Sequence, residues 1–436
     1  MRKTPAKKPR AAGPRRQKPQ PQGLRSQRRA GQAALLLALV LVTYSNSCSG
    51  GFEGDSGPIV AQDPRVQQVS RANLVLVFSQ QYWYPTADSG LYRPMVTLSW
   101  MFNYVLLGNR DRASGYHVVN LTLHLSNVLL AWLIALEVWK KPVAAFFTAA
   151  IFALHPINSE AVTNVAGRAD LMAALGVLGA LLQHALLMRS SGRRNVLGPV
   201  GIFAATLFGV FSKENAVVVP AVLFLYDMVI RERPFSWRRV FPGYAAATAA
   251  VIVMLVVRYS VLSGLPSPDL PFVDNPLVGA GFWTARLTAL EVVWRYVALL
   301  VWPQRLSWDY SYNQIPMATT AGGLVSVAGI ASVLVVLIWL VRRHPAVCFF
   351  GAFFFIALVP VSNLLLLIGT IMAERFLYLP SLGFSACLVA MLGIGWNGSS
   401  VTRVRPVLIG CLAVVAGALG LRTWQRNVDW TTKRVV

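Results

Sequence analysis

Residues 116–154 read YHVVNLTLHLSNVLLAWLIALEVWKKPVAAFFTAAIFAL. Two apolar runs flank the pair Lys140-Lys141, and the first run is long enough to cross a hydrocarbon core of about 30 Å. Comparable apolar runs recur along most of the sequence. The stretch therefore predicts two successive membrane-spanning helices, whose basic turn lies on the cytoplasmic side.

The composition of the whole chain agrees with a membrane location. Of the 436 residues, 55% are hydrophobic and 13% are charged, and the mean hydropathy is +0.54. A soluble domain carries about 25% charged residues. Too little polar surface remains to cover a water-soluble body of this size. We therefore expect an all-α polytopic integral membrane protein.

Part of the formal net charge of +23 comes from the N-terminal segment. Residues 2–29 hold eleven Lys or Arg residues and no acid, with Pro, Gln and Gly between them. Such a composition predicts a disordered cytoplasmic tail over 1–30 that contacts anionic lipids, and no nucleic-acid partner. The alternative is a signal peptide, formed by the apolar run 33–42 and the stretch Ser45-Asn46-Ser47-Cys48.

Loop charges orient the predicted spans, because Lys and Arg gather on the cytoplasmic side. Basic residues occupy every second loop, at Lys140-Lys141, at Arg189 with Arg193-Arg194, and from Arg231 to Arg239. The spans are predicted near 31–45, 116–138, 142–155, 170–188, 195–211, 215–230, 240–262, 320–341, 346–368, 376–396 and 406–421.

The segment 283–302 is apolar but contains Arg286, Glu291 and Arg295. Because charges at the bilayer midplane are costly, we expect an interfacial or re-entrant helix there. The result is about eleven spans within a transmembrane domain over 31–421. The N-terminus then lies in the cytoplasm, and an external segment covers 422–436.

Under this topology most acidic residues lie on the non-cytoplasmic side. At least thirteen of the seventeen are placed there: Glu53, Asp55, Asp63, Asp88, Asp111, Glu160, Asp170, Glu214, Asp269, Asp274, Asp309, Glu374 and Asp429. An enzyme that works on a lipid headgroup would show this arrangement, and so would an ion-coupled transporter. Topology alone leaves both classes open.

The external loops contain residues suited to acid–base chemistry and to phosphate binding. Asp55 follows the first span, where it could act as a general base or be an ordinary solvated carboxylate. The second loop holds His155, Glu160, Arg168 and Asp170. The alternative for this loop is a helix cap with a local ion pair between Arg168 and Asp170.

Two further span ends each place one cation beside one acid, at Lys213-Glu214 and at Glu374-Arg375. Several such cations on one side of a bundle could neutralise a phosphate leaving group. The four cysteines are scattered without zinc-binding or redox spacing. The sequence also lacks a nucleotide-binding glycine loop, an H-E-x-x-H helix and a G-x-S-x-G elbow.

A series of short motifs follows in order along the chain: Gly51-Phe52-x-x-Asp55, Asp63-Pro64-Arg65-Val66, Tyr92-Arg93-Pro94, Gly115-Tyr116-His117, His155-Pro156, Gly167-Arg168-x-Asp170, Ser212-Lys213-Glu214, Asp274-Asn275-Pro276, Asp309-Tyr310-Ser311-Tyr312, Ala373-Glu374-Arg375-Phe376 and Asn427-x-Asp429-Trp430. Together these motifs resemble one known family, the transmembrane and tetratricopeptide-repeat O-mannosyltransferases and their bacterial relatives. The resemblance extends from about residue 45 to 430.

The resemblance implies a C-type glycosyltransferase fold that works on the periplasmic or lumenal face, in a bacterial chain at the inner membrane. It implies an inverting transfer of a sugar, with mannose as one candidate, from polyprenyl phosphate to a hydroxyl of a protein or glycan acceptor. No cofactor is expected, because the lipid-linked sugar is a substrate. A divalent metal is neither required nor excluded. The family carries repeats after Trp430, so a chain that stops at Val436 is either a repeat-less relative or a truncated sequence.

The resemblance also suggests roles for the loop residues. Asp55 is expected to be the catalytic base, and Ser56 stands where the family has a second acid. The residues expected to hold or orient the donor phosphate and sugar are His155, Glu160, Arg168, Asp170, Lys213, Glu214, Glu374 and Arg375. Two alternatives remain, a lipid-sugar flippase or ion-coupled transporter using Asp227 or Glu291, and a catalytically inactive scaffold.

Overall fold

The computed structural model describes residues 22–189, 197–231, 236–266, 270–393 and 399–430, and within them no β-strand occurs. The α-helices are α1 (Gln22–Thr43), α2 (Arg71–Ser79), α3 (Pro94–Met101), α4 (Ala113–Trp139), α5 (Pro142–Leu154), α6 (Ser159–Thr163), α7 (Arg168–Arg189), α8 (Leu197–Ser212), α9 (Val219–Val229), α10 (Trp237–Leu262), α11 (Phe282–Val301), α12 (Thr320–Leu340), α13 (Pro345–Leu358), α14 (Pro380–Met391) and α15 (Ser399–Asp429). The all-α prediction is confirmed.

The quoted stretch forms the helical pair α4 and α5. Lys140 ends α4 in the left-handed conformation, with φ of 53°, as residues after a helix C-terminus often do. Pro142 then begins α5, where the missing N–H costs no hydrogen bond. Two residues are thus enough to reverse the chain between two buried helices.

Within the described ranges, five helices are long and apolar enough to cross a membrane: α4, residues Val165–Arg189 around α7, α10, α12, and residues Arg405–Asp429 of α15. A sixth span is formed if Pro142–Leu154 and Pro156–Thr163 are one segment, bent by 50°. The chain is therefore an integral membrane protein. Each predicted span overlaps a described helix, although α13 ends at Leu358, ten residues before the predicted end at 368. The count of eleven stays a prediction. Among the described helices, α11 does not meet the criteria for a span, and neither do the predicted spans α1, α8, α9, α13 and α14.

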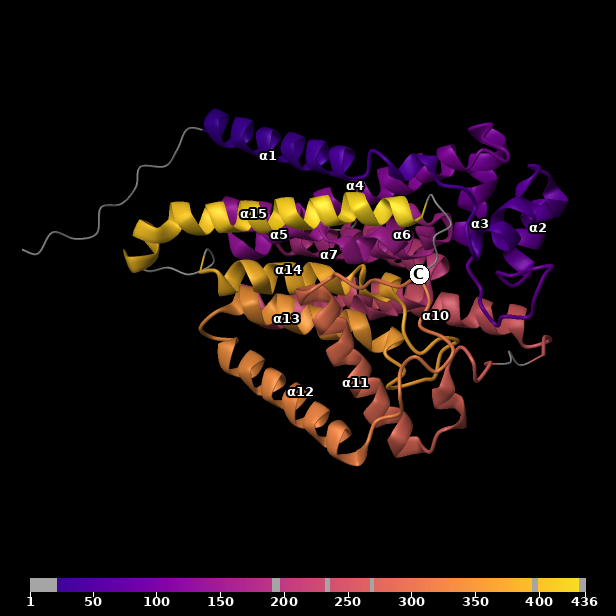
Figure 1. Cartoon of the computed structure of the whole chain (residues 1–436). Coiled ribbons are helices and arrows are strands. Elements are labelled where there is room, and N and C mark those ends of the chain that lie inside the picture. The colour runs from indigo at the N-terminus through magenta and orange to yellow at the C-terminus, as the bar shows by residue number, and fades with distance from the viewer. Residues whose placement is uncertain (1–21, 190–196, 232–235, 267–269, 394–398, 431–436) are drawn as a thin grey trace, which may run out of the picture.

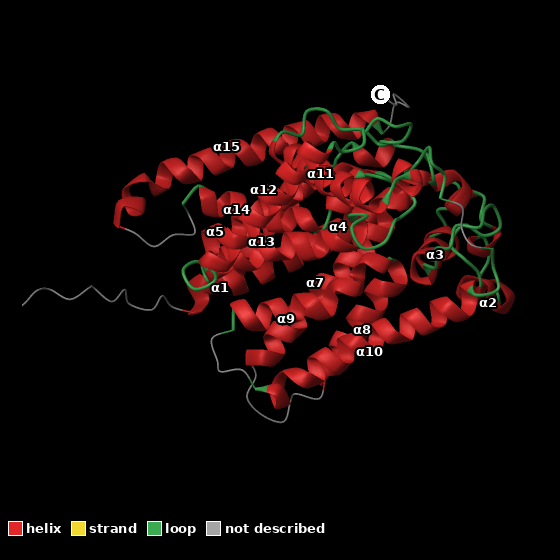
Figure 2. Cartoon of the chain, turned by 90° about the horizontal axis from the view of Figure 1, so that it is seen from below, coloured by secondary structure: helices red, strands yellow, loops and turns green. Residues whose placement is uncertain are grey.

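The bundle is layered around α4, α5 and α7. Figure 1 shows α1, α13, α14 and α15 with roughly aligned axes, whereas α11 and α12 are inclined to them. Figure 2 shows α8, α9 and α10 on the side away from α15. The two views place α2 and α3 together at one end of the bundle, where many of the connecting loops also lie.

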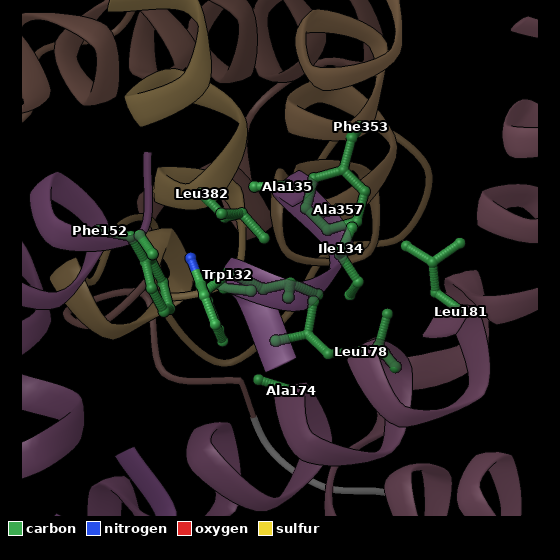
Figure 3. Close-up of a cluster of buried hydrophobic side chains, with 14 of the residues drawn as sticks. Trp132, Ile134, Ala135, Phe152, Ala174, Leu178, Leu181, Phe353, Ala357 and Leu382 are labelled. Carbon is green, nitrogen blue, oxygen red and sulfur yellow. The ribbon is translucent and has the colours of Figure 1, made fainter. Parts of the chain in front are cut away.

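Interlocking apolar side chains hold the central helices together. In Figure 3, Trp132 and Ile134 of α4 lie among Phe152 of α5, Leu178 of α7 and Phe353 of α13. These five side chains are almost completely buried. The packed core fixes the helix ends at which the loops begin, and so positions the loop residues.

Two helices at the ends of the chain extend beyond the predicted boundaries. The helix α1 begins at Gln22, inside the segment 1–30 that was predicted to be disordered, because the polar residues 22–30 contain no Pro and can continue the helix of the apolar run towards the N-terminus. The helix α15 continues without a break to Asp429, beyond the predicted span end at 421. Residues 1–21, the pair Arg193-Arg194, Arg233 and Asp269 lie outside the described residues.

Candidate functional site

Asp55 lies on a sharp turn in the first loop after α1. The turn requires Gly54, whose φ of 53° disfavours other residues. A Cβ atom at Gly54 would lie 2.7 Å from the Trp308 ring, so the indole packs directly against this turn. The Asp55 side chain itself is exposed. The fold thus presents one free carboxylate beside an aromatic ring from a distant loop.

Ser56, by contrast, is completely buried and supports the turn. Its hydroxyl donates to Asn164 Oδ1 at 2.9 Å and accepts from the Ala166 N–H at 3.2 Å. Ser56 therefore ties the first loop to the 3-10 turn η6 (Val165–Gly167). At the position where the family resemblance leads one to expect a second acid, this chain has a structural hydroxyl.

Three cations near this turn each bind an acid from another segment of the chain. The pairs are Arg93–Glu214 at 2.9 Å, Lys213–Asp170 at 2.6 Å and Arg375–Glu160 at 2.5 Å. The sequence neighbours Lys213 and Glu214 have different partners, and so do Glu374 and Arg375. The predicted local pair between Arg168 and Asp170 does not form, because Asp170 binds Lys213 instead.

The pairs lie close enough to one another to share one electrostatic field. Burial tends to lower the pKa of Arg375, but Glu160, Asp55 and Asp170 outweigh it and raise that pKa. Burial lowers the pKa of Lys213 to about 8, and Arg375 adds to the effect against the attraction of Asp170. Asp55 and the three pairs therefore form one site, to which six of the nine predicted residues belong.

The three cations differ in how accessible they are. The exposed fractions of the side chains are 30% for Arg375, 14% for Arg93 and 6% for Lys213. Lys213 Nζ contacts both oxygens of Asp170, at 2.6 and 2.7 Å. Arg375 uses only NH1 of its guanidinium on Glu160. Arg375 and Arg93 are thus the cations best able to reach a bound anion.

Arg93 and Trp308 are site residues that were not predicted from the sequence. Arg93 occurs in the quoted motif Tyr92-Arg93-Pro94, and its guanidinium lies 5.0 Å from the centroid of the Tyr82 ring. Asp55 and Glu214 contribute to the raised pKa of Tyr82, whose main cause is burial. An arginine within a motif was the available signal, whereas nothing in the sequence placed Trp308 near Asp55.

Glu374 lies behind Arg375 and is completely buried. Its Oε1 accepts from the Ser307 N–H at 2.5 Å and from the Tyr310 hydroxyl at 2.9 Å. Its Oε2 is 3.9 Å from Arg426 NH2, too far for a hydrogen bond. Burial raises the pKa of Glu374 to about 8. Glu374 thus connects the Trp308 loop and the end of α15 to the turn η11 (Glu374–Leu377).

Two predicted phosphate ligands belong to the scaffold instead. All three guanidinium nitrogens of Arg168 donate to protein oxygens, including Asn120 Oδ1 at 2.8 Å and Tyr116 O at 2.9 Å. His155 Nδ1 accepts from the Ile157 N–H, and its Nε2 lies 2.9 Å from Leu300 O. Both side chains are completely buried. Their polar atoms are used in holding the loops together.

The side chains of the site also bear on metal binding. Within the described ranges, no three His, Cys, Asp or Glu side chains gather as potential metal ligands. The acids of the site are instead occupied by Lys and Arg, except for Asp55.

Curated relatives share the sequence along nearly the whole chain. Protein O-mannosyl-transferase Tmtc1 of Drosophila melanogaster is 28% identical, over 90% of this chain and 55% of that protein. Protein O-mannosyl-transferase F38B6.6 of Caenorhabditis elegans is 25% identical, over 92% and 56%. The corresponding values for human Protein O-mannosyl-transferase TMTC3 are 25%, 92% and 46%. The chain is thus similar to these O-mannosyltransferases along most of its own length.

The chain spans about half the length of these O-mannosyltransferases. No family model matches it. Among solved structures, that of ArnT from Cupriavidus metallidurans in the apo state superposes with a TM-score of 0.53. The alignment covers 93% of this chain and 78% of ArnT at 16% identity, so it shows a shared fold alone. The sequence comparisons agree with the resemblance to the O-mannosyltransferases, and the superposition shows that the chain shares the fold of ArnT.

Proposed function

We propose that the chain is a membrane glycosyltransferase. It transfers a sugar from a polyprenyl-phosphate donor to a hydroxyl group of a protein or glycan acceptor. The observation that carries the proposal is the position of Asp55, a free carboxylate beside three clustered cations. Such a site can accept a proton and neutralise a departing phosphate in the same reaction.

In the proposed reaction Asp55 takes the proton of the acceptor hydroxyl. The acceptor oxygen forms a bond to the anomeric carbon while the bond from that carbon to the phosphate oxygen breaks. The bonding electrons leave with the polyprenyl phosphate, which gains negative charge, and the anomeric configuration inverts. Arg375 and Arg93 stabilise this charge directly, as preorganised cations do in active sites.

The remaining members of the site position these groups. Glu160 and Glu214 hold the two arginines, and Asp170 holds Lys213. Because Lys213 is nearly enclosed, its contribution to phosphate binding is mainly the field of its charge. We assign His155 and Arg168 to the support of the loops and remove them from the proposed donor ligands.

The orientation is part of the proposal. Lys140-Lys141, Arg342 and Arg343 mark the cytoplasmic side by the positive-inside rule. The site and the end of α15 then face the periplasm or lumen, where a donor in the outer half of the bilayer can reach Asp55. In a bacterium this membrane is the inner membrane.

The test is transfer of radiolabelled mannose from polyprenyl phosphate by the purified full chain. Asp55→Asn keeps the shape of the side chain but cannot accept the proton, so transfer should fall by roughly 10²–10⁴-fold. Asp111→Asn is the matched control, since Asp111 is an exposed external acid outside the site. Wild-type transfer by Asp55→Asn would contradict the assigned base. If the chain transferred another sugar but not mannose, Asp55 would remain the proposed base and only the proposed sugar of the donor would change.

The transporter alternative depends on Asp227 and Glu291. Asp227 is buried between helices, where His184 Nε2 lies 3.0 Å away and the Tyr244 hydroxyl donates at 2.6 Å. Glu291 lies on α11, in a surface groove against α12. The two acids occupy separate places in the fold. Their arrangement does not favour transport over glycosyl transfer.

A further inference from the structure

A groove between α11 and α12 lies apart from the site described above. Its lining is formed by Glu291, Trp294, Arg295 and Ala298 of α11 with Val325, Ser326 and Gly329 of α12. The Trp294 indole N–H donates to the Ser326 carbonyl at 3.3 Å. A Cβ atom at Gly329 would lie 2.7 Å from the Trp294 ring. The missing side chain therefore lets the ring pack on α12 and close the floor of the groove.

Two side chains of opposite charge, Glu291 and Arg295, line this groove. Glu291 and Arg295 are four residues apart and so lie on one face of α11. In the part of the chain that the structure describes, neither side chain forms a hydrogen bond or an ion pair. Arg295 is exposed and Glu291 is half-buried. A partly buried carboxylate and an exposed guanidinium at a membrane helix favour a ligand with both charges.

The groove opens towards lipid near one end of α12. Only 11% of the apolar window of α12 is buried, and Val325 is 72% exposed. The lining residues of α12 fall within ten residues of Thr320, hence within about 15 Å of the helix start at 1.5 Å per residue. The loop that carries Trp308 leads into this end of α12. The groove therefore lies in the half of α12 that follows the Trp308 loop, and its Glu291 carboxylate is at the start of that helix, where a Cβ atom at Gly322 would lie 2.5 Å from Glu291 Oε1.

We propose that the groove binds a phospholipid whose headgroup contains a phosphate and a primary amine. The phosphate is held by the Arg295 guanidinium, and the ammonium group donates to the Glu291 carboxylate. The first part of an acyl chain lies against Val325 and Ala298. This binding site is separate from the proposed donor site and does not depend on transferase activity.

The test uses the delipidated full chain in detergent, titrated with dioleoyl phosphatidylethanolamine, phosphatidylcholine or phosphatidylglycerol, with adducts measured by native mass spectrometry. Wild-type protein should bind the ethanolamine lipid most tightly, because choline cannot donate a hydrogen bond and glycerol carries no cation. Arg295→Gln should weaken all three by roughly tenfold, the effect of losing one charge-assisted contact. Glu291→Gln should remove the preference for ethanolamine and leave glycerol-lipid binding unchanged or stronger.

Arg286→Gln is the matched control on the same helix. The Arg286 guanidinium lies over the Phe282 ring at 4.8 Å and does not line the groove. Equal losses in Arg286→Gln and Arg295→Gln would overturn the proposal, as would equal binding of the three lipids by the wild type. Displacement of the bound lipid by polyprenyl phosphate would also overturn it, by assigning the groove to the donor. Correct folding of each variant is checked by its thermal unfolding profile.

Discussion

Replacement of Arg375 by Gln separates its roles in phosphate binding and in stability. The guanidinium is 30% exposed, and its partner Glu160 is 1% exposed. In Arg375→Gln, Glu160 loses its cationic partner. It still accepts the hydrogen bond from the backbone N–H of residue 375, at 2.8 Å. Breaking a fully buried pair costs about 3–5 kcal/mol. Because Arg375 is partly exposed and the backbone hydrogen bond to Glu160 is retained, we expect the free energy of unfolding to fall by about 1–3 kcal/mol.

The catalytic effect should be distinct from this destabilisation. Loss of a charge-assisted phosphate contact costs about 1.5–3 kcal/mol, so donor affinity and transfer should fall roughly ten- to a hundredfold. The double variant Arg375→Gln/Glu160→Gln removes the uncompensated carboxylate and should recover stability without recovering transfer. Radiolabel transfer, donor binding and thermal unfolding are measured together, with Arg342→Gln as the exposed control. If the double variant transferred at the wild-type rate, Arg375 would be only a partner of Glu160.

Three further predictions concern pH, the first loop and topology. Because the pKa of Lys213 is lowered to about 8, its positive charge is lost as pH rises through 8. Donor binding should decline there, whereas Lys213→Arg, charged at all these pH values, should abolish the decline. Ser56→Asp would face a carboxylate towards Asn164 Oδ1, so we expect a loss of about 1–3 kcal/mol in stability and no gain in transfer. In a cysteine-free background, cysteines replacing the exposed Tyr312 and Arg342 should react with an impermeant reagent from opposite sides of the membrane; labelling of both from one side would contradict the proposed topology.

The helices and their places in the chain could be predicted from apolar runs, because the length of such a run reflects the thickness of the membrane core. Charges within α11 likewise led to the prediction that this helix does not span, since Arg286, Glu291 and Arg295 are costly within a bilayer. The topology of the eleven spans still depends on these charges alone. Helix ends were less predictable: α15 extends to Asp429 because its last turns are held by tertiary contacts, such as the bond from Thr423 to Leu154 O.

The chemical types in the site were also visible in the sequence. Acids and cations at short external loops pointed to phosphate chemistry, and Asp55 was selected as the base. Arg168 and His155 could not be distinguished from true ligands. The sequence does not show whether the nitrogens of a side chain are all hydrogen-bonded to the protein or are free to bind a ligand. Trp308 was missed because its contact with Gly54 joins segments far apart in the chain.

The sequence by itself determined a helical membrane protein, the residue types of its site and its family resemblance. Composition and local patterning suffice for these, since they depend on the residues and their immediate neighbours. Only the tertiary structure decided which charges meet. Lys213 and Arg375 bind Asp170 and Glu160 rather than the acids beside them in sequence. The reason is geometric: packing of the core helices brings loop ends from distant segments within 3 Å, whereas adjacent side chains on the same turn point in different directions.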